Sequence, residues 1–148
     1  MKLNRREALA LGAGALFISL TPFRGALASL TEDEIKAFTG GAAVVEDDIV
    51  TLTAPEIAEN GNTVPIGISV DSPMTADNYV KRVRILAEGN PRPAVATMYF
   101  SPLSGSAEAS TRMRLATTQN IIAVAELSDG TYHMAKAEVK VTIGGCGG

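Results

Sequence analysis

The sequence predicts an all-β domain, an immunoglobulin-like antiparallel β-sandwich with a short N-terminal helix and a flexible C-terminal arm. Between residues 50 and 143, about seven short segments are rich in β-branched residues or alternate apolar with polar residues. Turn-forming residues separate these segments. The chain then ends in two glycines, a cysteine and two further glycines.

The first 28 residues have the pattern of an export signal. A basic start precedes an apolar stretch over residues 8–20, and residues 26–28 read Ala-Leu-Ala, a small-residue cleavage pattern. The adjacent Arg5 and Arg6 are similar to the twin-arginine type of signal, which delivers folded proteins across the bacterial inner membrane, so we expect a periplasmic protein. An ordinary secretory signal is the alternative. The apolar stretch is too short to span about 30 Å of hydrocarbon, so no membrane anchor is expected.

Removal of residues 1–28 leaves 120 residues that carry 9 basic and 15 acidic side chains, a net charge of −6. Binding to a phosphate backbone needs a basic surface, so nucleic acid is not an expected partner. The length suits a single domain over residues 29–143. The chain has no Trp and few other aromatic residues, so its core must consist mainly of Val, Ile, Leu and Ala.

The first element of the mature chain is predicted to be a short helix. Thr31 and Glu34 have the spacing of a capping box, which predicts a helix to about residue 38, and Gly40-Gly41 ends it. The acidic residues 46–48 are interpreted as the solvated start of a strand. Strands are then predicted over residues 50–53, 64–70, 79–86, 95–100, 109–115, 121–127 and 132–143.

The last two strands are joined by the clearest hairpin signal, Asp129-Gly130. In the last strand, alternate residues on one face are apolar: Ala137, Val139, Val141 and Ile143. We therefore expect a buried final strand that releases the chain at Gly144.

Residues 144–148 are the most informative part of the sequence. Cys146 is the only cysteine, so it cannot form an internal disulfide. Exported proteins usually use cysteines in pairs, which makes a single one an intermolecular partner or a reactive thiol. Glycines have no side chain to bury, so we expect a solvated arm. Five extended residues reach about 17 Å.

The other chemistry-bearing residues have ordinary explanations. His133, the only histidine, is interpreted as structural or solvent-facing rather than as a catalytic base. Zinc-binding and nucleophile motifs are absent from the sequence, so we expect no metal site and no catalytic residues. Arg82 with Arg84, and Arg112 with Arg114, each share one face of a strand. These pairs form either a polar outer face or a docking surface for an acidic partner or anion.

Several segments resemble SoxY, the sulfur-carrier subunit of the bacterial thiosulfate-oxidising Sox system. The most specific is the terminus, where residues 141–148 read Val-Thr-Ile-Gly-Gly-Cys-Gly-Gly. Residues 55–65, 70–74, 90–93 and 119–130 are similar to the family as well. The resemblance covers nearly all of the mature chain.

The resemblance implies a non-catalytic carrier that forms a SoxYZ heterodimer with the subunit SoxZ. Cys146 would be the covalent attachment site, on a swinging arm made of Gly144, Gly145, Gly147 and Gly148. The haem protein SoxAX would join thiosulfate to the cysteine as an S-thiosulfonate, and the dimanganese hydrolase SoxB would release sulfate and leave a persulfide. SoxCD, where present, would oxidise the outer sulfur to a sulfonate. Covalently bound sulfur intermediates are the only cofactor implied.

The residues alone leave two other functions open. One is an immunoglobulin-like interaction module in which Cys146 forms a permanent intermolecular disulfide. The other is a copper-binding chaperone that uses Cys146 together with methionines. Methionine is also a common filler of hydrophobic cores. The methionines concerned are Met74, Met98, Met113 and Met134.

Overall fold

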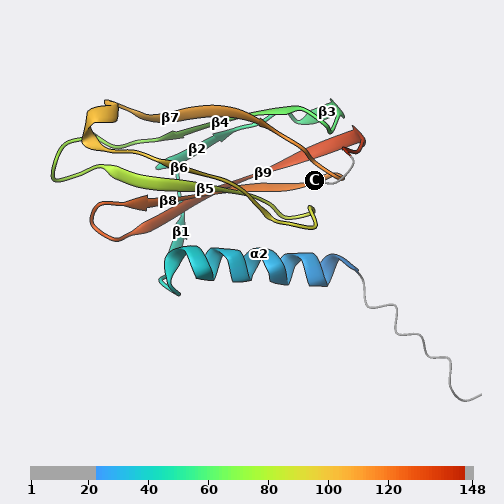
Figure 1. The fold of residues 1–148 in the computed structure, drawn as a ribbon, viewed down its shortest axis with the longest axis horizontal. Coiled ribbons are helices and arrows are strands. Elements are labelled where there is room, and N and C mark those ends of the chain that lie inside the picture. The colour runs from blue at the N-terminus through green and yellow to red at the C-terminus, as the bar shows by residue number, and fades with distance from the viewer. Residues whose placement is uncertain (1–22, 146–148) are drawn as a thin grey trace, which may run out of the picture.

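The computed structural model describes residues 23–145, with side chains from residue 28 onward. Its strands form two layers, and a helix lies along the outside of one of them (Figure 1). One sheet has the strand order β1-β9-β8-β5-β6, with β3 also paired to β9, and the other has the order β2-β4-β7. The strands are β1 Val44–Glu46, β2 Val50–Thr53, β3 Ile57–Asn60, β4 Val64–Val70, β5 Val80–Ala87, β6 Ala94–Tyr99, β7 Ala107–Met113, β8 Gln119–Leu127 and β9 Tyr132–Ile143.

The predicted all-β sandwich is confirmed, and so are the seven predicted strands. Strands β2, β4 and β9 have the predicted bounds, and the other four are displaced by one or two residues. The core between the sheets is aliphatic, as the composition requires, and methionines fill part of it. Its fully or almost fully buried side chains include Val64, Val80, Val83, Ile85, Leu115, Ile121 and Val139, with Met74 and Met113 packed beside them.

The strands β1 and β3 were not predicted, and both run parallel to β9. The antiparallel description of the sandwich is therefore incomplete. Each strand is very short, and only Ala58 of β3 and none of β1 is buried, so neither has the alternation that identifies a strand locally. The strand β9 supplies their pairing partners. Glu46 is consequently the end of β1 rather than the solvated start of a strand.

The helix α2, Phe23–Thr39, is longer than the segment predicted from the capping box. It is continuous through residues 26–28, the expected cleavage pattern. Its predicted end is confirmed, because Gly40 and Gly41 have positive φ angles of 65° and 86°, which a glycine adopts without strain. Within the described residues, no helix is both long and apolar enough to cross a membrane.

The helix packs on the six-stranded sheet through Phe38, whose side chain is 3% exposed. Phe38 contacts a small apolar cluster of Leu86, Ile122 and Val124 on the outer face of that sheet. The guanidinium groups of Arg82 and Arg84 lie 4.3 and 5.0 Å from the centre of its ring. Such cation–π contacts add to the burial of the ring.

Ion pairs complete this helix–sheet contact. Arg84 pairs with Glu34 of the helix at 3.1 Å, and Arg82 pairs with Glu126 of β8. The hydrogen bond to Glu126 raises the pKa of Arg82 above its ordinary value. The first arginine pair is thus engaged by the chain's own helix and sheet, which contradicts the hypothesis that it is a free docking surface. Arg112 and Arg114, from the other sheet, are exposed.

Candidate functional site

The candidate site is the end of strand β9, from which the predicted arm continues. Of the predicted arm, Gly144 and Gly145 are described, whereas Cys146, Gly147 and Gly148 lie outside the described residues. The site is therefore built from the groups that hold Gly144 and Gly145. We call this set the arm base: Gly61, Leu115, Ala116, Gly144 and Gly145.

Three chain segments meet in the arm base and are hydrogen-bonded in series through their backbones. The N–H of Gly61, just after β3, donates to the carbonyl of Ile143 at 2.7 Å. The N–H of Leu115, just after β7, donates to the carbonyl of Gly61 at 2.8 Å. The N–H of Gly145 then donates to the carbonyl of Leu115 at 2.8 Å. Gly61 and Gly145 are both buried. The end of β9 is thus tied to two other segments.

We expected the chain to leave the domain at Gly144, and the structure differs from this expectation. Gly145 is still hydrogen-bonded to the domain, although strand pairing ends at Ile143. The expected buried face is also only partly observed. Val139 is fully buried, but the side chain of Ile143 is 66% exposed. Backbone contacts, rather than a buried side chain of the strand, hold the last described residues in place.

The glycines of the arm base have no room for a side chain. A Cβ on Gly61 would lie closer than 3.0 Å to the Leu115 carbonyl oxygen and to the Gly145 nitrogen. A Cβ on Gly144 would overlap the carbonyl oxygen of Ala116, and one on Gly145 would lie 2.7 Å from the carbonyl oxygen of Gly61. All of these obstacles are backbone atoms, which cannot rotate away. Close approach of three backbones is therefore what requires glycine here.

A buried asparagine fixes the segment that carries Leu115. Asn90, 2% exposed, donates from Nδ2 to the carbonyl of Arg114 at 2.9 Å. Its Oδ1 accepts from the N–H of Ala116 at 3.0 Å and from Nε2 of Gln119 at 2.9 Å. Asn90 thus brackets Leu115 on both sides. A buried amide that makes three hydrogen bonds is a rigid and specific support.

Gln119 extends this support. Its Nε2 also donates to the carbonyl of Thr117 at 3.0 Å, and its Oε1 accepts from the N–H of Gly89 at 2.8 Å. The neighbouring Thr118 accepts a 2.9 Å hydrogen bond from the N–H of Val141 through Oγ1. The segment between β7 and β8 is therefore bonded on one side to the turn after β5 and on the other to β9.

A hollow of about 370 Å³ lies beside this segment. Its walls include Thr117, Thr118 and Asn120, and also the carboxylates Glu88 and Glu138. Two carboxylates repel an anion, so the hollow does not suit a bound sulfur oxyanion.

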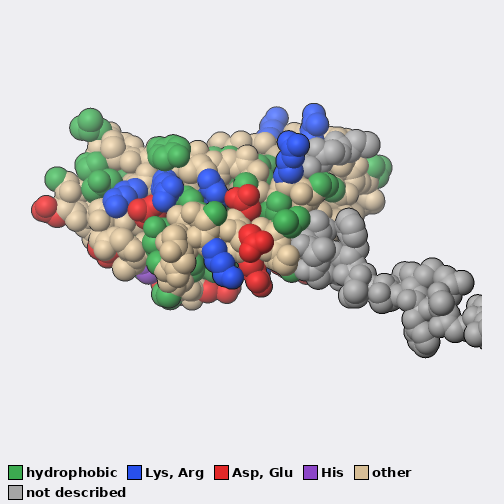
Figure 2. All heavy atoms as spheres, turned by 60° about the horizontal axis from the view of Figure 1, so that its bottom comes forward, with side chains coloured by type: hydrophobic (Ala, Val, Ile, Leu, Met, Phe, Trp, Pro, Cys, Tyr) green, Lys and Arg blue, Asp and Glu red, His purple; other side chains and the backbone are tan. Residues whose placement is uncertain are grey.

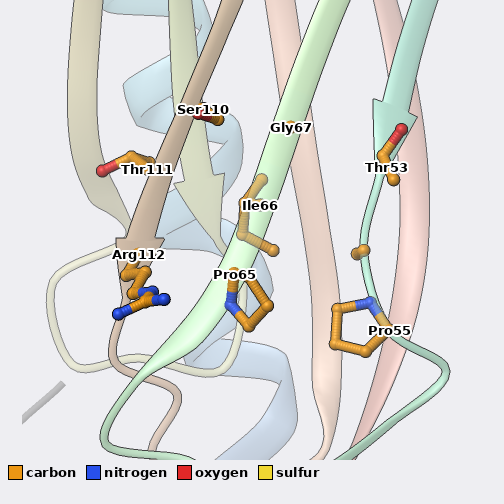
Figure 3. A pocket seen from close by; sticks show the side chains of 9 residues that line it. Thr53, Pro55, Pro65, Ile66, Gly67, Ser110, Thr111 and Arg112 are labelled. Atoms are coloured by element: carbon orange, nitrogen blue, oxygen red, sulfur yellow. The ribbon is translucent and has the colours of Figure 1, made fainter.

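A second hollow, of about 670 Å³, is a shallow depression on the outer face of the β2-β4-β7 sheet (Figure 3). Small or flat side chains line its floor, among them Thr53, Pro65, Gly67 and Ser110, and Arg112 lies at one end. One cation and several hydroxyl groups do not form an enzyme active site by themselves. The depression is a smooth sheet face of small residues.

His133 has a structural environment. Its Nδ1 lies 2.7 Å from a carboxylate oxygen of Asp47, and its Nε2 lies 3.1 Å from the hydroxyl of Thr131. These contacts tie the loop after β1 to the hairpin before β9. Ten residues of strand separate His133 from Ile143, a distance of about 33 Å at the rise of a β-strand. His133 therefore cannot act on a group attached near the end of β9.

The four methionines considered as soft ligands come from different parts of the fold: Met74 follows β4, Met98 lies in β6, Met113 ends β7 and Met134 lies in β9. Met74 and Met113 are buried in the core, and Sδ of Met74 accepts the N–H of Val80 at 3.5 Å. Residues 28–145 contain no group of three or more His, Cys, Asp or Glu side chains arranged to hold a metal ion.

Figure 2 shows the side of the molecule that carries helix α2, where Lys and Arg side chains are interspersed with Asp and Glu. No patch of a single charge dominates this face.

Sequence reasoning missed the residues that hold the arm base, namely Gly61, Asn90, Leu115 and Gln119. A signal was nevertheless present, because Gly61, Asn90 and Gln119 fall in segments that resembled SoxY (55–65, 90–93 and 119–130). The structure shows that these three segments, distant in sequence, converge at the end of β9.

Comparison with known proteins agrees with this geometry. The family described as "Sulfur oxidation protein SoxY" matches residues 35–146. The solved structure of the sulfur carrier protein SoxY from Chlorobium limicola f thiosulfatophilum is 35% identical, with a TM-score of 0.67, over 78% of this chain and 99% of that one. A comparison with curated proteins gave no match.

More distant structures share the fold alone. A superoxide reductase (neelaredoxin) from Ignicoccus hospitalis is 18% identical, with a TM-score of 0.56, over 62% of this chain and 78% of that one. A putative superoxide reductase from Thermotoga maritima is 17% identical, also with a TM-score of 0.56, over 66% and 93% of the two chains.

Proposed function

The chain belongs to the SoxY family, and on that premise we propose that it is a periplasmic sulfur carrier that holds thiosulfate-derived sulfur covalently on Cys146. The observation that carries this proposal is the position of the cysteine. The only thiol in the chain directly follows Gly145, the last described residue, whose N–H is hydrogen-bonded to the domain. A thiol at that position is attached to a firmly built domain by a segment without other side chains.

The loading step that the family relationship implies is an oxidation. The sulfur of Cys146 and the outer sulfur of thiosulfate form an S–S bond, which releases the thiol proton and two electrons. The haem protein SoxAX would accept the two electrons, and the product is the cysteine S-thiosulfonate. The groups of the arm base that surround Gly145 are backbone atoms. We expect the partners to supply the activation of the thiol, as for a carrier rather than an enzyme.

The unloading step is a hydrolysis. Water supplies the fourth oxygen of sulfate, the bond between the outer sulfur and the sulfonate breaks, and a persulfide remains on Cys146. SoxB performs this step, and SoxCD, where present, oxidises the persulfide sulfur to a sulfonate that SoxB then removes. SoxZ is the proposed heterodimer partner. The acidic hollow beside the arm base is consistent with sulfur anions being bound by the partners and not by this domain.

The test is the mass of the intact protein purified without reductant from thiosulfate-grown cells, with fragmentation of its C-terminal peptide. We expect sulfur and sulfonate additions on Cys146 that a reductant removes, and none in a Cys146→Ser variant. A uniformly unmodified thiol in the wild type would refute the carrier function. A Cys146 disulfide dimer as the sole form would favour the structural module instead.

Localisation is tested on the same protein. Export by the twin-arginine pathway predicts a mature N-terminus at Ser29 and a periplasmic location. Replacing Arg5 and Arg6 together by lysine should leave the uncleaved chain in the cytoplasm. Normal export of that variant would indicate an ordinary secretory signal.

A further inference from the structure

We propose that the hollow beside the segment between β7 and β8 binds the α-ammonium group of Ser29, which export creates when residues 1–28 are removed. Glu88 and Glu138 supply the carboxylates of this hollow, and Ala28 forms another part of its wall. The inference rests on the proposed export and on cleavage after Ala28. It makes no use of the sulfur chemistry.

One side of the hollow is a row of three side chains, Glu88, Asn120 and Glu138, which we call the acidic row. Asn120 of β8 and Glu138 of β9 are cross-strand partners. Nδ2 of Asn120 donates to a carboxylate oxygen of Glu88 at 2.8 Å, and the N–H of Glu88 donates to the Asn120 carbonyl at 3.0 Å. Asn120 lies two residues before Ile122, which packs with Phe38 of the helix. The acidic row is therefore on the face of the sheet that α2 covers.

Among the described residues, the two carboxylates of the acidic row have no cationic partner. The recorded ion pairs of this part of the chain include neither Glu88 nor Glu138. Lys136 and Lys140 flank Glu138 on the same face of β9, but both are exposed and neither is paired with it. Glu88 is half-buried. Two carboxylates in one hollow repel each other, so a cation between them is favoured.

The chain itself delivers a positive charge to this hollow when the signal is removed. Ala28 is a wall residue, and the nitrogen of Ser29 is bonded to its carbonyl carbon at about 1.3 Å. In the uncleaved chain that nitrogen belongs to a neutral amide. After cleavage it is an amino group, which is mostly protonated at neutral pH because its ordinary pKa is about 7.7–8.0. The cation therefore forms at the wall of a hollow that contains two carboxylates.

The sequence of α2 provides for a helix start near this position. In the uncleaved chain α2 begins at Phe23, so Thr31 lies within the helix, although Thr31 and Glu34 have the spacing of a capping box. A capping residue belongs at the first end of a helix. Cleavage after Ala28 removes the earlier part of α2 and leaves Thr31 two residues from the new terminus. The capping box thus lies where the mature helix has to begin.

A free ammonium group at this point is unfavourable unless carboxylates lie beside it. The start of a helix has a partial positive charge from its unpaired N–H groups, and this charge repels a cation. The start of α2 lies toward the end of the sheet where β9 ends (Figure 1), which is where the acidic row offers the opposite charge. The mature helix would then be held to the sheet at both ends, by the ring of Phe38 at one and by the ammonium of Ser29 at the other.

The first test is the titration of the Ser29 amino group in the mature protein, residues 29–148, followed by nuclear magnetic resonance of its α-proton. We expect the pKa of this group to lie about 0.5 to 1 unit above its ordinary range, a threefold to tenfold gain in proton affinity, because nearby carboxylates favour the charged form. In the double variant Glu88→Gln with Glu138→Gln, the pKa should return to the ordinary range. Glutamine keeps an oxygen that accepts from Asn120, so the hydrogen bond within the acidic row is retained. Identical titrations in the wild type and the double variant would overturn the proposal.

The matched control is Glu46→Gln with Glu108→Gln, which changes the net charge by the same amount. Both side chains are exposed; Glu46 ends β1, and Glu108 lies in β7 of the other sheet. We expect the amino group of the control to titrate as in the wild type. A change as large as in the acidic-row variant would mean that net charge alone sets the pKa, and it would refute the site.

Acetylation of Ser29 is the second test, because a bound and an unbound ammonium predict opposite signs. Without a partner, removing the positive charge from a helix start stabilises the helix. With the acidic row as partner, the same change leaves two carboxylates unpaired. Hydrogen exchange of the α2 amides should then be about threefold faster or more in the acetylated protein, the factor that the expected pKa shift implies. Unchanged or slower exchange would contradict the proposal.

Failure of this site and failure of the proposed function are separate outcomes. The mass of the periplasmic protein identifies its first residue, and a first residue other than Ser29 would reject both the cleavage position and the site. Ser29 as the first residue, with an amino group that titrates in its ordinary range, would retain the cleavage and reject the site. A shifted amino group without sulfur adducts on Cys146 would retain the site and reject the carrier function.

Discussion

Replacing Asn90 by alanine should destabilise the whole domain as well as the arm base. The amide of Asn90 is 2% exposed and makes hydrogen bonds of 2.9, 3.0 and 2.9 Å to Arg114, Ala116 and Gln119. At about 1 kcal/mol of net stabilisation for each bond, the loss is about 3 kcal/mol. For a domain of this size, we expect the melting temperature to fall by about 12 °C, at about 4 °C for each kcal/mol.

Chemical denaturation followed by circular dichroism measures this change, because the midpoint shifts while the slope stays constant. The matched control is Asn62→Ala, since Asn62 is exposed and its side chain donates a 3.0 Å hydrogen bond to Asn60. We expect the control to stay within about 0.5 kcal/mol of the wild type. A loss below about 1 kcal/mol in Asn90→Ala would show that the amide is not the support inferred from its contacts.

Three further predictions concern the rest of the domain. Phe38→Ala should cost about 3 kcal/mol in a denaturation experiment, because it empties the helix–sheet contact; a loss under about 1 kcal/mol would mean that the helix is not held by this ring. Gly41→Ala should cost about 1 kcal/mol in the same assay, because φ is 86° and no atom within 4 Å offers compensation; an unchanged midpoint would contradict the left-handed helix end. Thr131→Val should raise the pKa of Asp129 toward its ordinary value of 3.8, because the hydroxyl and backbone hydrogen bonds from Thr131 lower it, and titration by nuclear magnetic resonance measures the shift. The stabilisation linked to this shift is present above the ordinary pKa of Asp129 and is lost as the pH falls through its lower pKa in the folded protein. If the stability of the wild type and of Thr131→Val depends on acid pH in the same way, the Thr131 hydroxyl makes no such contribution.

Strong local periodicity explains which elements could be predicted. Strand β4 alternates buried and less buried residues along its length, and its bounds were predicted without error. Strand β8 is buried almost throughout and was recognised by its β-branched residues. The strands β1 and β3 have too few buried residues to form a pattern and exist because β9 pairs with them. Their absence from the prediction reflects tertiary pairing, which a local pattern does not contain.

Arg82 and Arg84 on β5 also show that a local pattern does not contain tertiary contacts. Their i, i+2 spacing correctly placed Arg82 and Arg84 on one face, but spacing cannot tell what covers that face. The helix that covers it is joined to the sheet through Phe38 and Glu34, residues about 45 positions earlier, a separation that no local pattern spans. A polar strand face predicted from sequence can therefore be exposed or covered by another element, and the sequence pattern of the strand does not say which.

The glycines of the domain fall into two kinds that the sequence alone does not distinguish. Gly40 and Gly41 are glycine because their φ angles are positive, a local requirement that the sequence pattern captured as a helix stop. Gly61 and Gly145 have no positive φ, and they are glycine because another backbone occupies the space of a side chain. From the sequence, Gly145 was interpreted as part of a solvated arm, and Gly61 was given no role of its own. A side chain on Gly61 would collide with the backbones of Leu115 and Gly145, and one on Gly145 would collide with the backbone of Gly61. A substitution at Gly61 or Gly145 therefore tests how closely three segments approach one another. A substitution at Gly41 tests only one turn.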